Sequence, residues 1–247
     1  MQASRVGAVI ILAMVLVYLV CRLLAGHIKI ASRAYGREKD RLMRRQIANS
    51  LEESAPIHLD IGNTTEGSLG GGTVLSAAEA TATVSAQMAF ADEPWVITGS
   101  GGLSSAFEKD AVKTGMEAAD YGSSFDTDCA VYTGSAVMAH AAGNAASLDM
   151  EPSALHLSMG AFGPAAALTD TLCSRGEVLC VAGDDLVSQA VGTVTADAVF
   201  IGEQFTEIPD SLNRTEKKSP ALLAMDILRW ALIAVIVVFA AMGLSGI

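Results

Sequence analysis

A glycine-rich stretch near residue 65 has the residue types of a ligand-binding loop. The segment HLDIGNTTEGSLGGGT, residues 58–73, has the pattern of a strand that runs into a loop and then into a helix. Backbone N–H groups at the start of a helix bind phosphate and other small anions, and amide and hydroxyl side chains add further donors. The candidate ligand-binding residues of this stretch are Asn63, Thr64, Gly70, Gly71, Gly72 and Thr73.

The loop departs from both common nucleotide-binding motifs. The dinucleotide fingerprint G-x-G-x-x-G starts with Gly70 and Gly72, but Leu75 stands at the position of its third glycine. A Walker A loop needs a lysine before its Ser or Thr, and this stretch contains none. Two interpretations stay open: the loop binds a nucleotide or small anion, or it packs against a neighbouring subunit or the next loop. The sequence identifies no cofactor.

Other polar residues give weaker indications of chemistry. Gly99 and Ser100, in TGSGG, follow another predicted strand and are further candidates for ligand binding, but the pattern around a nucleophilic serine is absent. Glu203 is the best candidate for a functional acid. His58 and His156 fall in apolar strands, which predicts core histidines with satisfied hydrogen bonds. No histidine spacing indicates a metal site, and we nominate no catalytic residue.

The elements that must position these residues alternate regularly between residues 57 and 203. Short apolar runs, each followed by glycine or a small polar residue, alternate with alanine-rich segments, which predicts a parallel sheet covered by helices on both faces. The predicted strands are residues 57–62, 94–99, 129–134, 154–160, 177–183 and 198–203, and the predicted helices are residues 74–91, 104–122, 135–149, 164–176 and 185–197. We therefore predict a Rossmann-like α/β fold with a mainly parallel six-strand sheet, which binds ligands at the carboxyl ends of its strands.

The order of these segments resembles that of a known family. The runs HLDIGNTTEGSLGGGT, PWVITGSGG, SMGAFGPAAALTD, CVAGDD and VFIGEQFTEIP, followed by an apolar helix, are similar to the prokaryotic membrane-protein family catalogued as domain of unknown function 6754. The resemblance covers about residues 57–244. Ala165 and Gln204 stand where the family frequently has acidic residues. The resemblance implies the architecture and a membrane location, but no activity.

Two apolar segments flank this region. The first is uncharged over residues 6–21, and the second covers residues 221–247. A helix of about 20 residues spans the hydrocarbon layer of a membrane, so both segments are predicted to be transmembrane helices, the first as a retained anchor and not as a cleaved signal peptide. Asp226 and Arg229 lie three residues apart, so they share one helix face and can form a pair.

Charge divides the chain into a basic arm and an acidic body. Residues 1–50 contain nine Lys and Arg against two acidic residues, whereas residues 56–210 contain three against twenty-one. Basic clusters flank the acidic body, so the positive-inside rule places it in the cytoplasm and both termini outside the cell membrane. The basic arm suits anionic lipids, whereas an acidic body repels nucleic acid. The composition fits an ordinary acidic protein or one from a high-salt cytoplasm.

The predicted organisation has five parts. They are transmembrane helix 1–26, a basic amphipathic juxtamembrane helix 27–55, an acidic α/β domain 56–210, a linker 211–220 and transmembrane helix 221–247. The juxtamembrane helix either continues the membrane helix or lies along the membrane surface, with an apolar stripe made by Ile28, Ile30, Ala31, Tyr35, Leu42 and Ile47. The four cysteines lack metal-binding spacing, which predicts reduced, buried thiols. Asp184 and Asp185 follow a strand, where such a pair caps a helix more often than it holds a cation.

The functional expectation from these features is structural. Two anchors, a body rich in small residues and the lack of a catalytic motif predict a homo-oligomeric membrane scaffold or assembly subunit. The alternative is a membrane-bound sensor that binds a nucleotide or small anion at the carboxyl ends of the strands. A membrane-bound enzyme is a third interpretation, for which the sequence offers no nucleophile or metal.

Overall fold

The computed structural model describes residues 2–24, 38–62, 71–91, 95–150, 153–173, 178–213 and 219–244. The chain forms two compact units. One contains residues 33–214 and is an α/β structure, and the other joins residues 1–32 with residues 215–247.

Six parallel strands form the sheet of the α/β unit in the order β3-β2-β1-β4-β5-β6. The strands are β1 (Ile57–Ile61), β2 (Trp95–Gly99), β3 (Ala130–Tyr132), β4 (Leu155–Gly160), β5 (Val178–Gly183) and β6 (Ala198–Val199). This is the strand order of doubly wound dinucleotide-binding folds, in which the order reverses between the first and fourth strands. The predicted α/β class and parallel sheet are confirmed, although β6 is shorter than predicted.

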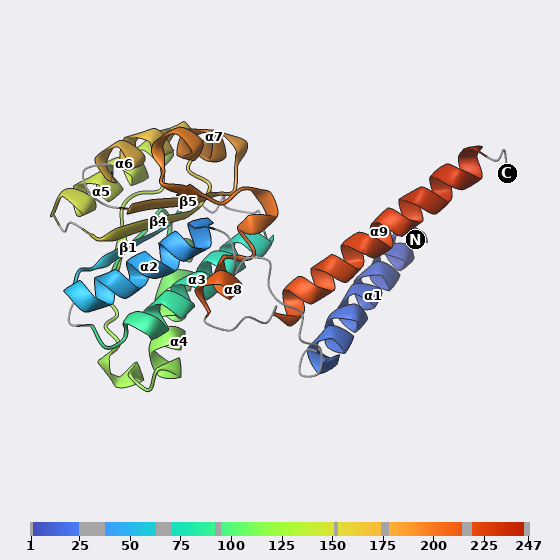
Figure 1. Cartoon of the computed structure of the whole chain (residues 1–247), viewed down its shortest axis with the longest axis horizontal. Helices are drawn as coiled ribbons and strands as arrows, with labels where there is room; N and C mark the ends of the chain where they lie inside the picture. Colours follow the sequence, from blue (N-terminus) through green and yellow to red (C-terminus); the bar gives the residue numbers. More distant parts are fainter. Residues whose placement is uncertain are drawn as a thin grey trace. The chain divides into compact units, whose positions relative to one another are not determined.

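Helices cover both faces of the sheet (Figure 1). On one face lie α5 (Val137–Met150), α6 (Ala166–Cys173) and α7 (Leu186–Thr195). On the other lie α2 (Glu38–Glu53), α3 (Gly71–Met88), α4 (Gly102–Ala118) and α8 (Ile208–Leu212). The described residues of this unit also contain the 3-10 turns η2 (Gly122–Ser124), η3 (Gly163–Ala165) and η4 (Gly202–Gln204).

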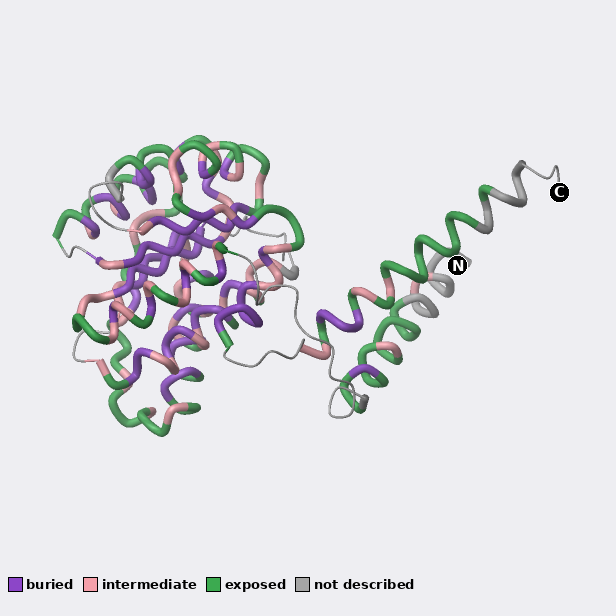
Figure 2. Tube along the Cα trace, in the orientation of Figure 1, coloured by how far each residue is buried: buried purple, intermediate pink, exposed green. Residues whose placement is uncertain are grey.

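The core lies mainly on the α2–α3 face of the sheet, because the central strands send their apolar side chains there. Ile57, Leu59 and Ile61 of β1 join the apolar residues of β4 and the buried residues of α2 and α3 in one cluster. The continuous buried band through the sheet is visible in Figure 2. Side chains alternate between the faces of a strand, so the remaining residues of β1 and β4 point toward α5. Those residues are polar, and the site below is built from them.

The basic helix α2 belongs to the α/β unit, which differs from the predicted separate juxtamembrane helix. Met43 and Ile47 are fully buried in the core. Lys39 Nζ donates to Val199 O at 2.8 Å and lies 5.1 Å from the centre of the Phe200 ring. Part of the basic arm therefore packs on the acidic body, where Lys39 donates a hydrogen bond to a backbone carbonyl. Of the predicted stripe, Leu42 and Ile47 pack on the core, and the other four residues lie outside the described ranges.

The carboxyl end of the α/β unit also differs from the predicted boundary at residue 210. Helix α8 crosses that boundary, and its Ile208 and Leu212 are buried in the main core. Arg44 of α2 donates to Ser211 O at 2.6 Å, and this hydrogen bond links α2 to α8. The segment predicted as the start of a linker is therefore part of the packed structure.

The second unit is a pair of helices, α1 (Gln2–Leu24) and α9 (Pro220–Leu244). Val17 and Cys21 of α1 pack against Leu223 and Ala224 of α9. The predicted Asp226–Arg229 pair forms, at 3.9 Å between Oδ1 and a guanidinium nitrogen. Within the described residues, α9 alone is long and apolar enough to cross a membrane, over Pro220–Val237. The apolar run of α1, Ile11–Leu23, is shorter, so the prediction of two transmembrane helices is supported only for α9.

Candidate functional site

The face of the sheet under α5 carries a layer of buried polar side chains. Register pairs Asp60 of β1 with Thr98 of β2 and Ser158 of β4, and it pairs His58 of β1 with His156 of β4. All five side chains lie on the same face and are buried. Buried polar groups cost free energy unless hydrogen bonds satisfy them. The hydrogen bonds that satisfy these groups therefore define the site.

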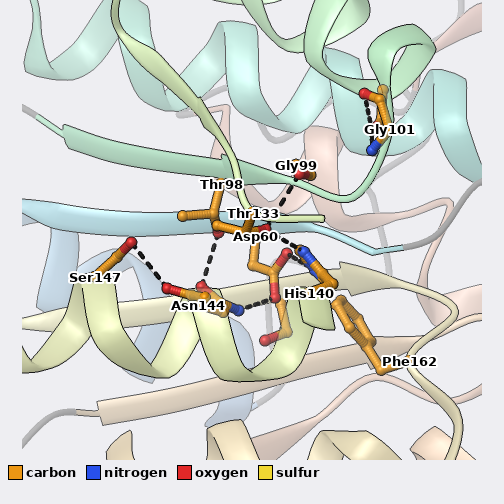
Figure 3. Close-up of polar contacts among 12 residues, drawn as sticks. Asp60, Thr98, Gly99, Gly101, Thr133, His140, Asn144, Ser147 and Phe162 are labelled. Atoms are coloured by element: carbon orange, nitrogen blue, oxygen red, sulfur yellow. Dashed lines mark hydrogen bonds and ion pairs between the residues drawn. The ribbon is translucent and has the colours of Figure 1, made fainter. Parts of the chain in front are cut away.

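Two residues of α5 converge on the Asp60 carboxylate (Figure 3). His140 Nε2 lies 2.9 Å from Asp60 Oδ1, and Asn144 Nδ2 donates to Asp60 Oδ2. The two residues are four apart in sequence, so they lie on one face of the helix. On its other side, His140 Nδ1 lies 2.5 Å from the hydroxyl of Thr133, which follows β3. Asp60 thus accepts two side-chain hydrogen bonds inside the protein.

The hydrogen bonds beyond Asn144 have one consistent direction. Because Asn144 donates its amide to a carboxylate, its carbonyl accepts from the Thr98 hydroxyl at 2.8 Å. Thr98 then accepts from His58 Nε2 at 3.1 Å. His58 Nδ1 accepts from His156 Nδ1, and His156 Nε2 accepts from Ser158 at 2.6 Å. Every donor in this chain points toward Asp60.

Burial and nearby charges shift the pKa values of the three histidines, and these shifts agree with the directions of the hydrogen bonds. Burial lowers the pKa of His58 well below its ordinary value, and the nearby His156 and His140 lower it further. Burial lowers the pKa of His156 to about 4, although the Asp60 charge opposes the shift. Both rings are therefore neutral near pH 7. Burial also opposes the charged form of His140, but the charge and hydrogen bond of Asp60 outweigh burial and raise its pKa.

A small pocket opens beside His140 at the carboxyl end of β4. It is a partly open hollow, whose empty space of about 220 Å³ includes open solvent, and it is lined by Val137, His140, Ala141, Ala161, Phe162, Ala165, Ala166 and Thr169. The lining is apolar except for His140 and Thr169. Ligands of doubly wound sheets bind near the point where the strand order reverses, and β4 is one of the two strands at that point. The pocket therefore lies where the fold places ligands.

Phe162 fills the end of the sheet between β1 and β4. A Cβ atom at Gly62 would lie 2.7 Å from the Phe162 ring, so only glycine permits this packing. The Phe162 ring also stacks at 6.4 Å from His140. Asp185 holds the loop, because its carboxylate accepts from the backbone N–H groups of Phe162 and Gly163 at 3.2 and 3.3 Å. The aromatic ring thus packs directly against the backbone at the carboxyl end of β1.

A second unusual carboxyl group lies on the other face of the same sheet edge. Glu108 of α4 is fully buried, and neither of its side-chain oxygens has a hydrogen-bond partner. It packs against Gly99, where an added Cβ would lie 2.6 Å from Glu108 Oε2. Burial raises the pKa of Glu108 to about 8; the Asp60 charge adds to this shift and Lys109 opposes it. Glu108 is therefore protonated at neutral pH.

Of the nine residues that the sequence suggested for ligand binding, six lie within the described ranges. Asn63, Thr64 and Gly70 lie outside the described residues, and Gly71, Gly72 and Thr73 form the first turn of α3. The Thr73 hydroxyl donates to Asp184 Oδ2 at 3.1 Å, so a carboxylate of this chain already contacts that helix start. Gly99 contributes only its carbonyl, which accepts from Thr133, and Ser100 is buried. Glu203 lies exposed after the edge strand β6, three strands from β1.

Other predictions about polar residues hold. His58 and His156 are fully buried with satisfied hydrogen bonds. Asp185 caps α7 by accepting from the N–H groups of Val187 and Ser188, as predicted for a helix start. Cys21 and Cys180 are free, buried thiols, and Cys129 is free and half-buried. Burial raises the pKa of Cys180 to about 12.

Sequence reasoning missed Asp60, His140, Asn144, Thr133 and Phe162 as members of a site. Two signals were present. The strand segments HLD (58–60) and HLS (156–158) both alternate polar and apolar residues, which indicates one polar face. His140 and Asn144 have the spacing of one helix face. No signal in the sequence indicated that these three segments meet.

The fold and the site define a class: a doubly wound α/β protein with a buried histidine–carboxylate site at the reversal point of its sheet, joined to a helix that can cross a membrane. Comparisons with models of known protein families and with curated proteins gave no match for this chain. The similarity to the family named above is therefore a prediction, and the site is interpreted from its own chemistry.

Proposed function

We propose that the protein is a membrane-anchored α/β protein that binds a small, mainly apolar, uncharged ligand in the pocket beside His140. The observation that carries this proposal is the buried Asp60–His140 pair, whose imidazole forms part of the pocket wall. A buried ion pair costs more to desolvate than its attraction returns in many proteins, and hydrophobic residues can replace it without loss of stability. A buried pair beside a pocket therefore favours a functional role over a purely structural one.

The chemistry of the lining favours an uncharged ligand over a nucleotide. The His140 imidazole is already paired with the Asp60 carboxylate, which disfavours an anionic ligand beside it. The lining is dominated by alanine, valine and phenylalanine side chains. Phe162 packs against the backbone at the carboxyl end of β1, and Asp184 adds negative charge at the start of α3. These features support a sensor of small apolar molecules in place of the nucleotide or small-anion sensor that was the alternative expectation from the sequence.

Methyl butyrate is a suitable probe of this site. It is expected to raise the thermal unfolding temperature of the detergent-solubilised protein, whereas butyrate, its charged analogue, is expected to have little effect. Saturating ligand stabilises by about 2.7 kcal/mol at a hundredfold excess over Kd. Ala166→Trp fills the pocket and should abolish the shift, whereas Ala106→Trp, at an exposed position of α4, should preserve it. An equal shift in both variants would place binding elsewhere.

Anchoring by both α1 and α9 completes the proposal. Their contact through Cys21, Leu223 and Ala224 supports two helices that share one environment, and the basic residues before α9 support a cytoplasmic α/β unit. A cysteine introduced at Thr215 is expected to resist a membrane-impermeant thiol reagent in intact cells, whereas one introduced at Gln2 should react. Labelling at position 215 and protection at position 2 would reverse the proposed topology.

A second candidate function is assembly with further copies, as expected from the sequence. Helix α7 supports it, because Leu186 and Val194 lie eight residues apart on one side and are 83% and 87% exposed. Confinement in one membrane plane raises the effective concentration of copies. Salt screens repulsion between acidic bodies, so we expect a homo-oligomer that becomes more stable as salt rises. Light scattering across a salt series tests this, and a monomer at every concentration would remove the scaffold proposal.

A further inference from the structure

We propose that Thr133, His140 and Asp60 form a hydroxyl–imidazole–carboxylate relay in which Thr133 Oγ1 is a nucleophile toward small carboxylic esters. The inference deepens the proposed function and rests on it, because the pocket beside His140 would hold the apolar part of the ester. Triads of this kind are recognised by geometry and by the role of each group, not by sequence position. Thr133 and His140 would be catalytic residues, and Asp60 a positioning residue.

The distances place the three groups in the required order. Thr133 Oγ1 lies 2.5 Å from His140 Nδ1, and His140 Nε2 lies 2.9 Å from Asp60 Oδ1. Asp60 is fully buried and His140 nearly so, whereas Thr133 is half-buried. The carboxylate therefore keeps the proton of His140 on Nε2. In the neutral ring, Nδ1 is then a bare acceptor that faces the Thr133 hydroxyl, and it lies nearer to that hydroxyl than the second acceptor, Gly99 O, which is 3.2 Å away.

Thr133 lies at a tight turn between a strand and a helix, at the ligand-binding edge of the sheet. Gly134 follows it with φ of +131°, a backbone conformation that residues with a Cβ rarely adopt. Thr133 also packs closely against Gly143 of α5, where a Cβ atom would lie only 2.8 Å from Thr133 Cβ. The turn and this contact fix the hydroxyl beside the ring. A nucleophile held at a sharp strand-to-helix turn is also the arrangement of α/β-hydrolases.

The proposed step balances without a cofactor. Thr133 Oγ1 attacks the ester carbonyl carbon while its proton moves to His140 Nδ1. The resulting C–O bond makes a tetrahedral intermediate, and the bond to the alcohol oxygen then breaks. His140 returns the proton to the departing alkoxide, which leaves an acyl ester on Thr133. Water then attacks the acyl carbon while one of its protons moves to His140 Nδ1, the bond between the acyl carbon and Thr133 Oγ1 breaks, and His140 returns the proton to Oγ1 as the carboxylic acid leaves.

Acetylation by p-nitrophenyl acetate tests the proposal directly. The full-length protein in detergent is expected to release p-nitrophenol and to carry one acetyl group on the peptide that contains Thr133, as mapped by mass spectrometry. His140→Ala is expected to slow acetylation by about 100-fold or more, the usual contribution of a general base. Thr133→Ser should retain labelling, because it keeps the hydroxyl, whereas Thr133→Val should remove it.

Matched controls separate the relay from a structural role of Thr133. Ser135→Ala removes an exposed hydroxyl two residues away and should leave the rate unchanged. Labelling of another residue, or labelling of Thr133 at a rate that His140→Ala does not change, overturns the relay. The Thr133→Val variant should still bind methyl butyrate. If the native protein does not bind methyl butyrate but Thr133 is still acetylated, the result would contradict the proposed pocket and not the relay.

Discussion

Replacement of Glu108 by glutamine is expected to stabilise the protein at pH 9 by about 4 kcal/mol and to leave its stability nearly unchanged at pH 4. In the folded protein, burial holds the Glu108 pKa near 8, whereas the unfolded chain ionises near the ordinary value of 4.5. Between these values the folded state keeps a proton that the unfolded state has lost. Stability contributed by this group is therefore full below pH 4.5 and declines until about pH 8.

The measurement is denaturant unfolding of native and Glu108→Gln protein at several pH values. The difference between the two curves isolates Glu108, because all other groups are shared. Glu117→Gln is the matched control, since Glu117 lies on the same helix but its side chain is 59% exposed. The control should not change the pH dependence. Parallel curves for native and Glu108→Gln protein across this range would show that Glu108 is not buried as a neutral acid.

Replacement of Asp60 by alanine is expected to lower the free energy of unfolding by about 3–5 kcal/mol at pH 6, the usual effect of removing one partner of a buried ion pair. The variant leaves His140 charged without a counterion and Asn144 without its acceptor. Asp60 raises the His140 pKa, so the stability gained from this pair is full below about pH 6.5 and is lost as pH rises through the higher folded value.

The loss caused by Asp60→Ala should therefore become smaller in alkaline solution. Chemical denaturation at pH 6 and pH 9 measures both values. Asp110→Ala, at an exposed position of α4, is the control and should change stability by no more than about 0.5 kcal/mol. A loss below about 1 kcal/mol at pH 6 would contradict a buried, charged Asp60–His140 pair.

The architecture of the α/β unit was predictable because its determinants are local. Each strand is a short apolar run that ends at glycine or a small residue, and each helix between strands is rich in alanine. These patterns fix the class of fold, and the right-handed connection of parallel strands restricts the possible orders. The core histidines and the Asp185 cap follow from the same local patterns.

The site was not predictable, because its members come from four segments of the chain. His58 and Asp60 alternate with apolar residues within a run treated as continuously apolar, and nothing in the sequence showed that α5 covers their polar face. The glycine-rich loop attracted the ligand prediction, although the Phe162 side chain from the loop after β4 packs against the backbone at the carboxyl end of β1. The basic helix α2 was predicted to continue the membrane helix or to lie along the membrane surface, because the lysine and arginine contacts that it makes with distant carbonyls are tertiary and leave no local pattern.

The most direct test of the account is a histidine-selective ¹⁵N–¹H NMR titration of the full-length protein with methyl butyrate. We expect the signals of His140 to shift and saturate, since its ring forms part of the pocket wall. His58 and His156 should keep their signals, with protons on Nε2 and Nδ1 respectively, because both are buried in the hydrogen-bond chain behind Asp60. A titration that leaves His140 unchanged at saturating ester would contradict a ligand site at this pocket.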